Sequence, residues 1–185
     1  IDQMVAQLQE LGNTRLSQSE LAYRRLERLI VTLKLKPRQS LTETALIDMA
    51  GLGRTPVREA LQRLELEGLL SIRPRSGIEI SALDPAEFPK ILAVRKSVEM
   101  LMCWGAASYA HAEHDVMFEE VRSLMQAALA ANDIEAFLDA DKAFDVVLGE
   151  ACANPYAARL AAPLQTHSRR FWYRLRRDTG LESAV

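Results

Sequence analysis

Hydrophobic residues recur along most of the chain with the spacing of helices. The first such stripe, with a period of about 3.6 residues, stops near Pro37; its members are Leu21, Leu26, Leu29, Ile30 and Leu33. Similar patterns predict helices over residues 43–49, 55–67, 89–110, 114–130, 133–150 and 155–177. We expect Thr42 to cap the first of these and Pro163 to interrupt the last.

A different pattern occupies the stretch between Glu67 and Pro89, where glycine and proline are concentrated. Residues 70–73 and 78–80 alternate between apolar and polar side chains, which predicts a two-stranded hairpin with its turn at residues 74–77. Three helices followed by a hairpin is the order of a winged helix-turn-helix. The fold class predicted is therefore mainly α, with an N-terminal winged helix-turn-helix followed by an all-α helical bundle.

These elements predict the division of the chain. We expect a leader at residues 1–18, a winged helix-turn-helix at 19–81, a linker at 82–88 and a helical domain at 89–185.

The third predicted helix separates its apolar and basic residues onto two faces. Its apolar stripe consists of Val57, Ala60, Leu61 and Leu64. Arg54, Arg58 and Gln62 lie about 110° away around the helix axis. An apolar anchor with a basic face near the helix N-terminus is typical of a recognition helix in the DNA major groove.

This face has the chemistry that DNA binding requires. A guanidinium can donate two hydrogen bonds to guanine O6 and N7, and Thr55 at the helix start can contact a phosphate. The hairpin adds Arg73 and Arg75, which suit the DNA backbone or the minor groove. The alternative is a solvated face in which Arg58 pairs with a neighbour such as Glu59 or Gln62.

Charge and composition support a protein with two different modules. The net charge is −2, but residues 19–81 carry +3 and residues 82–168 carry −7. A basic first module suits a polyanion. Two cysteines are too few for a disulfide framework, and no apolar run is long enough to span a bilayer. We expect a cytoplasmic protein with no membrane association.

The second module places charged residues on apolar helix faces. Asp141 lies inside the arc drawn by Phe137, Leu138, Phe144, Leu148 and Ala151, and Asp145 lies at its edge. Arg95 similarly lies among apolar residues, with Glu99 one turn later. Buried charges need partners, so the alternatives are ion pairs within the protein or a polar ligand pocket.

The first module resembles the N-terminal domain of GntR-family bacterial transcription regulators. The resemblance is carried by residues 35–41, by 53–61 (Gly-Arg-Thr-Pro-Val-Arg-Glu-Ala-Leu), by 64–70 and by 74–77. It implies that Arg54, Thr55 and Arg58 contact an operator. Gly53 stands where the family usually has a capping serine or threonine, and Thr44 stands where some members have another DNA-contacting arginine.

The second module resembles the helical effector-binding domain of the FadR/FCD subgroup. Residues 95–99, 141–145 and 153–154 carry this resemblance. It implies effector contacts from Arg95 and Asn154, small carboxylate effectors, and a divalent metal (Zn²⁺, Mn²⁺ or Ni²⁺) held by an Asp-x-x-x-His pair and two later histidines. Asp141 matches the aspartate, whereas Asp145 replaces the first histidine. The later histidines are expected beyond Val185, so we expect the chain to stop before the last helices of this domain.

The function predicted is that of a ligand-responsive transcription regulator, not an enzyme, which binds a palindromic DNA operator as a homodimer. Two alternatives stay open. One is a metal-dependent enzyme that uses Asp141, Asp145 and His167; the other is a protein-interaction module whose winged helix does not bind DNA. The effector, the operator and the sign of regulation are left open.

Overall fold

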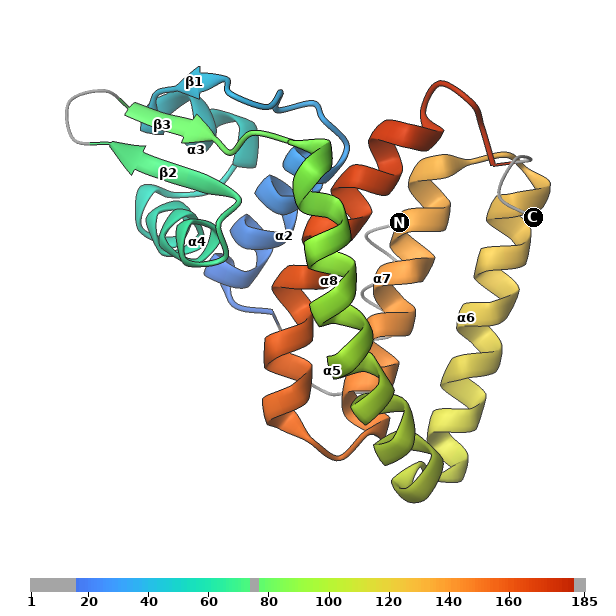
Figure 1. Ribbon diagram of the computed structural model, residues 1–185. Coiled ribbons are helices and arrows are strands. Elements are labelled where there is room, and N and C mark those ends of the chain that lie inside the picture. The colour runs from blue at the N-terminus through green and yellow to red at the C-terminus, as the bar shows by residue number, and fades with distance from the viewer. Residues whose placement is uncertain (1–15, 74–76, 182–185) are drawn as a thin grey trace. The chain divides into compact units, whose positions relative to one another are not determined.

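The computed structural model describes residues 16–73 and 77–181. The chain divides into two compact units, Ile1–Ala82 and Leu83–Val185. The first unit contains helices and a small sheet, whereas the described elements of the second unit are all helical (Figure 1). The predicted fold class, a winged helix-turn-helix followed by a helical bundle, is confirmed.

The first unit has three helices and three strands within its described residues. In chain order they are α2 (Gln18–Val31), β1 (Ser40–Leu41), α3 (Glu43–Ala50), α4 (Arg54–Leu66), β2 (Leu70–Arg73) and β3 (Gly77–Ile80). Helices α3 and α4 form the helix-turn-helix, and β2 and β3 form the hairpin of the wing.

The sheet has one strand more than the sequence predicts. Its strand order is β1-β3-β2, and all neighbours are antiparallel. Strand β1 pairs Ser40 with Glu79 and Leu41 with Ile78. Two residues are too few to show an alternating pattern, which is why this strand was not predicted. The pairing also explains Gly77, because a Cβ there would lie 2.6 Å from the Leu41 carbonyl oxygen.

The ends of the helices follow from local sequence. The Ser17 side chain caps α2, and the Thr42 hydroxyl accepts a hydrogen bond from the Ala45 amide, as predicted for α3. Helix α3 ends at Gly51, which has a φ of 63°. Gly53 precedes α4 and provides no side-chain cap, since glycine stands there in place of the family's usual serine or threonine.

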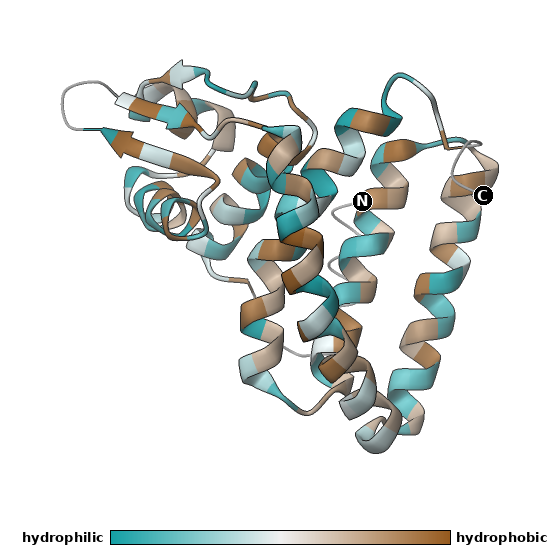
Figure 2. Cartoon of the chain, in the orientation of Figure 1, coloured by the Kyte–Doolittle hydropathy of each residue, from teal (hydrophilic) through white to brown (hydrophobic). Residues whose placement is uncertain are grey.

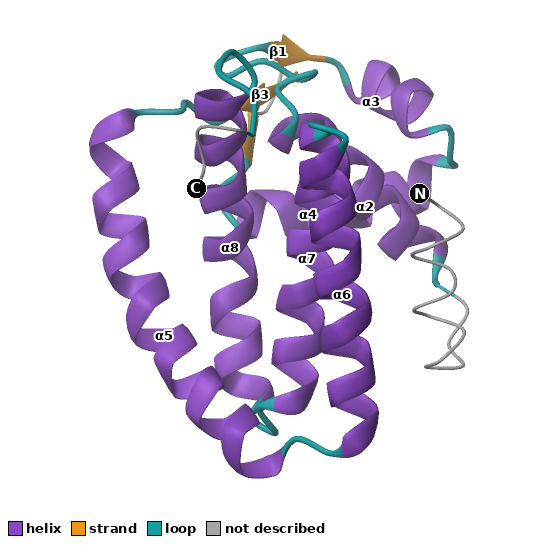
Figure 3. Cartoon of the chain, turned by 90° about the vertical axis from the view of Figure 1, so that its right-hand side faces the viewer, coloured by secondary structure: helices purple, strands orange, loops and turns teal. Residues whose placement is uncertain are grey.

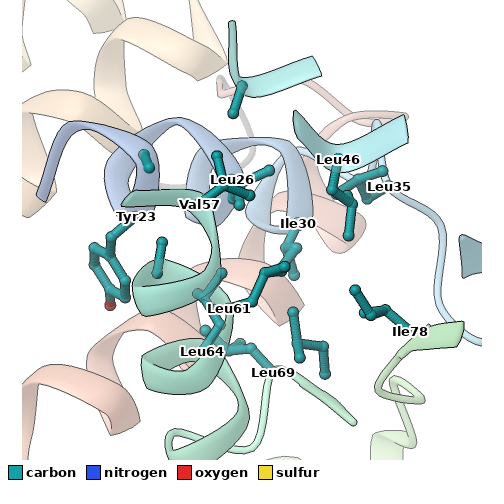
Figure 4. Close-up of a cluster of buried hydrophobic side chains, with 14 of the residues drawn as sticks. Tyr23, Leu26, Ile30, Leu35, Leu46, Val57, Leu61, Leu64, Leu69 and Ile78 are labelled. Carbon is teal, nitrogen blue, oxygen red and sulfur yellow. The ribbon is translucent and has the colours of Figure 1, made fainter. Parts of the chain in front are cut away.

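One apolar core holds the first unit together (Figure 4). Leu26 and Ile30 of α2 lie against Val57, Leu61 and Leu64 of α4, all of them almost completely buried. The full cluster also includes Leu46 of α3, Leu69 just before β2, and Leu70, Ile78 and Ile80 of the two hairpin strands. The position of α4 is therefore fixed by the apolar stripe that the sequence predicted.

The second unit is built from four long helices, preceded by a short 3₁₀ helix at Pro85–Glu87 (Figure 3). They are α5 (Phe88–Tyr109), α6 (Ala112–Ala130), α7 (Ile134–Ala151) and α8 (Pro155–Arg176). Hydrophilic and hydrophobic residues are interspersed along each of these helices (Figure 2). Short connections join successive helices, as in an up-down bundle. Of the described helices, none has both the length and the apolar character that crossing a bilayer requires.

Two predictions about these helices were wrong. Helix α8 runs without interruption through Pro163, because buried side chains such as Ala161 and Gln165 hold it on both sides of the proline. On α7, Phe144 is 37% exposed and Val147 takes a core position instead. The packed face of α7 is therefore rotated from the predicted arc, which makes Asp145 more buried than Asp141.

Small side chains let the helices of the second unit approach closely. Ala106 on α5, Ala151 on α7, and Ala157 and Ala161 on α8 belong to one buried cluster with Met102 and Leu148. A Cβ on Gly105 would lie 2.3 Å from the carbonyl oxygen of Cys152. Glycine at this position therefore permits the contact between α5 and the end of α7.

Candidate nucleic-acid interface and effector site

Helix α4 presents two separate faces, as the sequence predicts. Val57, Ala60, Leu61 and Leu64 are buried in the core. The side chains proposed for DNA contact, Arg54, Thr55, Arg58 and Gln62, are all exposed. Because the buried face cannot turn, the exposed face is held as one rigid surface.

Arg58 and Arg54 both point to a carboxylate on the preceding helix. The Arg58 Nε donates to both carboxylate oxygens of Glu43, at 2.9 Å each. The Arg54 Nε lies 3.6 Å from Glu43 Oε1. The surface ion pair that the sequence left open for Arg58 is therefore present, but its partner is Glu43 on α3 and not a neighbour on α4. No bond from the two terminal nitrogens of Arg58 is seen among the described residues.

The first turn of α4 offers backbone donors as well as side chains. Gly53 makes no side-chain cap bond, so the amide groups of Arg54 and Thr55 keep their donors for another acceptor. Pro56 lies in the same turn and has no amide hydrogen to satisfy. A helix start of this kind binds anionic oxygen atoms such as those of phosphate.

The wing contributes one described arginine. The Arg73 guanidinium lies 3.0 Å from Glu79 on the neighbouring strand, and its side chain is 60% exposed. Arg75, the other predicted DNA contact on the wing, lies outside the described residues.

A second polar cluster fastens the far half of α4 to α2. The Tyr23 hydroxyl donates to Glu67 at 2.6 Å, and the Arg63 guanidinium lies 3.6 Å above the Tyr23 ring. Arg63 also donates to Glu20 and Glu67. Burial and the neighbouring carboxylates raise the pKa of Tyr23, so its hydroxyl stays protonated and acts as a donor.

In the second unit, Asp141 and Asp145 meet an arginine from α8. The Arg169 Nη1 donates to Asp145 Oδ2 and lies 3.5 Å from Asp141 Oδ2. The Arg169 Nη2 donates to Thr166 at 3.2 Å. The pairing with a neighbouring arginine, one of the alternatives stated for these carboxylates, is therefore present.

The environment of Asp145 disfavours its charged form. Burial raises the pKa of Asp145 to about 7, while the Arg169 guanidinium opposes this shift and the Asp141 carboxylate adds to it. Its side chain is only 6% exposed, against 28% for Asp141.

Arg95 lies beside this cluster and joins α5 to α8. Its Nε donates to Glu99 at 2.7 Å and its Nη1 donates to Ser168 at 2.9 Å. Gln165 donates to the same Glu99 oxygen at 3.0 Å. The ion pair between Arg95 and Glu99, one of the two alternatives that the sequence left open, is thus present, and two buried polar residues of α8 extend it.

Arg95 also borders a shallow groove of about 550 Å³ that is open to solvent and whose lining residues all belong to one face of α5. The groove is lined by Leu92, Arg95, Lys96, Glu99, Met100, Cys103 and Trp104. Its lining combines two cations, Arg95 and Lys96, and the carboxylate of Glu99 with a mainly apolar wall.

Two other residues have different surroundings. Asn154, a predicted effector contact, caps α8 by accepting hydrogen bonds from the amides of Tyr156 and Ala157; it does not line the groove. His167 lies on α8, half-buried. Within the described residues, no group of three or more His, Cys, Asp and Glu side chains is placed to hold a metal ion.

Comparison with known proteins assigns the two units. Residues 18–80 match the family described as "Bacterial regulatory proteins, gntR family", and residues 90–185 match the FCD domain. The chain belongs to the gntR family. The matched families and the named relatives of this regulator are transcriptional regulators and not enzymes.

Several relatives of the regulator are named HTH-type transcriptional regulators. One from Agrobacterium vitis is 34% identical over 140 residues, which cover 71% of this chain and 78% of that protein. One from Streptomyces ambofaciens is 35% identical over 124 residues, which cover 66% of this chain and 51% of that protein. The repressor RspR of Escherichia coli K12 is 27% identical over 126 residues, which cover 68% of this chain and 55% of that protein. The matched part of the chain thus spans about half the length of two of these relatives.

Solved structures show the same fold. E. coli McbR/YncC aligns with a TM-score of 0.79 at 20% identity, covering 91% of this chain and 80% of that one. A GntR regulator from Rhodococcus sp. RHA1 aligns with a TM-score of 0.63 at 17% identity, covering 85% and 75%.

Proposed function

We propose that this gntR-family regulator binds duplex operator DNA through the first half of α4. The observation that carries the proposal is the exposed face formed by Arg54, Thr55, Arg58 and Gln62, on a helix whose opposite face is locked in the core. Such a helix can enter the major groove without rearranging the unit. Since its partner is DNA, we place the protein in the cytoplasm.

Each residue of this face has a distinct role in the proposal. Arg58 directs its two terminal nitrogens to guanine O6 and N7, while its Nε stays on Glu43. Arg54 and Gln62 reach neighbouring bases or phosphates. The Thr55 hydroxyl and the free amides of the first turn bind a phosphate oxygen. Arg73 and Arg75 on the wing bind the backbone or the minor groove.

We further propose that the protein acts as a homodimer on a palindromic operator. One recognition helix reads only one half-site, and two-fold symmetric proteins match half-sites about one helical turn apart. The helical unit exposes large apolar side chains outside the α5 groove that an interface can bury, among them Val94, Leu101, Val116 and Leu160.

The effector proposed is a small carboxylate that binds in the α5 groove. Arg95 and Lys96 offer cations for the carboxylate, and Leu92, Met100 and Trp104 offer an apolar wall for the rest of the molecule. A ligand at Arg95 would compete with Glu99 and Ser168 for the same guanidinium. Binding of the effector would therefore weaken the hydrogen bond that joins Arg95 on α5 to Ser168 on α8.

Selection of duplexes from a random library with the full-length protein tests the DNA proposal. The expected result is a symmetric consensus, bound by two protomers per duplex in light scattering, with affinity that falls steeply as salt rises. A half-site duplex should bind more weakly. Recovery of no consensus, with no salt-dependent binding, would favour the protein-interaction module instead.

Thermal shift with a panel of small mono- and dicarboxylates tests the effector proposal. A carboxylate that raises the melting temperature of the wild type should lose this effect in Arg95→Met and keep it in Arg122→Ala. Arg122 lies on α6 in a surface ion pair with Glu119, so its removal takes away one positive charge but leaves the groove intact. Equal shifts in both variants would contradict a role for Arg95.

A further inference from the structure

The two carboxylates of α7 share one buried guanidinium. Arg169 of α8 approaches Asp145 and Asp141 through a single nitrogen, Nη1, and its other terminal nitrogen donates to Thr166. Its side chain is 7% exposed, and that of Asp145 is 6% exposed. Arg169 therefore lies where a cation bound by both carboxylates would lie.

The residues present do not fit the divalent metal that the FCD resemblance implies. Asp145 stands where the resemblance expects a histidine, and a metal with nitrogen preference gains nothing from a carboxylate at that position. Both carboxylates already contact the buried guanidinium of Arg169. A metal ion on the same oxygens would also stand beside the buried positive charge of Arg169. That arrangement would break the ion pair and leave a guanidinium with a like charge next to it.

A guanidinium satisfies the same carboxylates without these costs. It is permanently charged, planar and rich in donors, so it can serve two acceptors and a hydroxyl at once. Thr166, one turn before Arg169, helps to fix the plane of the group by accepting a hydrogen bond from its Nη2. The guanidinium of α8 thus offsets one of the two carboxylate charges of α7 within the chain.

We infer that Arg169 is the resident cation of the FCD unit and takes the place of a divalent metal at Asp141 and Asp145. The inference concerns α7 and α8 alone, so its test involves neither DNA nor effector and fails or succeeds independently of the proposed function.

Metal analysis of the full-length protein, purified without chelator, is the first test. We expect much less than one equivalent of Zn, Mn or Ni per chain. We also expect the same melting temperature in EDTA and in each divalent ion. About one tightly held equivalent, whose removal lowers the melting temperature of the wild type but not of Asp141→Ala, would overturn the inference.

Removing Arg169 is the second test. Arg169→Ala leaves two facing carboxylates and space between them, so its melting temperature should fall by several degrees and Mn²⁺ or Zn²⁺ should then raise it. The double variant Arg169→Ala, Asp145→Asn should not respond to these ions. Arg122→Ala serves as the matched control for loss of one positive charge. If Arg169→Ala melts at the same temperature as the wild type and divalent ions do not change that temperature, the inference is contradicted. If the variant does not fold, the metal analysis of the wild type decides.

Discussion

The Nε of Arg58 on α4 donates to both carboxylate oxygens of Glu43 on α3, at 2.9 Å each. This contact uses only one edge of the guanidinium. The edge with the two terminal nitrogens, which can form the paired hydrogen bonds to guanine, is left for DNA. Glu43 therefore orients the side chain on which sequence-specific binding would depend, and it also places a negative charge next to the proposed interface.

Replacing Glu43 by glutamine should weaken discrimination more than binding. Glu43→Gln removes the anchor of Arg58 and a charge that repels phosphate, so affinity for unrelated duplexes should rise while the preference for the operator falls severalfold. Fluorescence anisotropy of operator and scrambled duplexes over a range of KCl concentrations measures both effects. Asp48→Asn, a matched charge loss at an exposed position on α3, serves as the control. A parallel change on both duplexes would contradict an orienting role for Glu43.

The attachment of α4 to α2 should contribute measurably to stability. Tyr23→Phe removes the hydroxyl that donates to Glu67 at 2.6 Å, and it should lower the free energy of unfolding by about 1 kcal/mol. Urea unfolding followed by circular dichroism gives this value. Tyr109→Phe is a suitable control because that side chain is 62% exposed. Equal stability of the two variants would show that the Tyr23 hydrogen bond contributes nothing.

Much of the fold could be predicted because it depends on local sequence. The 3.6-residue spacing placed every long helix, the threonine at position 42 predicted a cap, and the two faces of α4 followed from the apolar stripe. The errors have physical reasons as well. Strand β1 is too short to carry a pattern, and packing on both sides carries α8 through Pro163.

The candidate sites were predicted less completely because their partners are distant in sequence. Periodicity identified Arg58 and Asp145 but could not identify Glu43 or Arg169, which lie on other helices 15 and 24 residues away. The sequence did contain a pattern that points to Arg169 as a buried partner. The polar residues Gln165, Thr166, Ser168 and Arg169 lie close together on a helix that must pack against the bundle, and all four are buried.

The raised pKa of Asp145 predicts a pH dependence of stability. Its carboxyl group titrates near 3.8 ordinarily and at about 7 in the folded chain, so between these values the folded state binds more protons than the unfolded state. The stability from this group is complete below the lower value and is lost as the pH rises through the higher one, with a slope of at most about 1.4 kcal/mol per pH unit.

Asp145→Asn cannot titrate and should remove this contribution. Unfolding in urea between pH 4 and pH 8 should show that the wild type gains stability relative to the variant as the pH falls. Asp178→Asn, at an exposed position, should follow the wild type throughout. Identical pH profiles for wild type and Asp145→Asn would contradict the raised pKa.

The central claim is that the exposed face of α4 reads DNA, and Arg58→Ala tests it most directly. Binding of the full-length variant to the selected operator should weaken by about 1–3 kcal/mol, with relaxed preference at one guanine per half-site. Arg122→Ala, which removes one charge from the helical unit, should bind as the wild type does. Operator affinity of Arg58→Ala equal to that of the wild type would contradict the account.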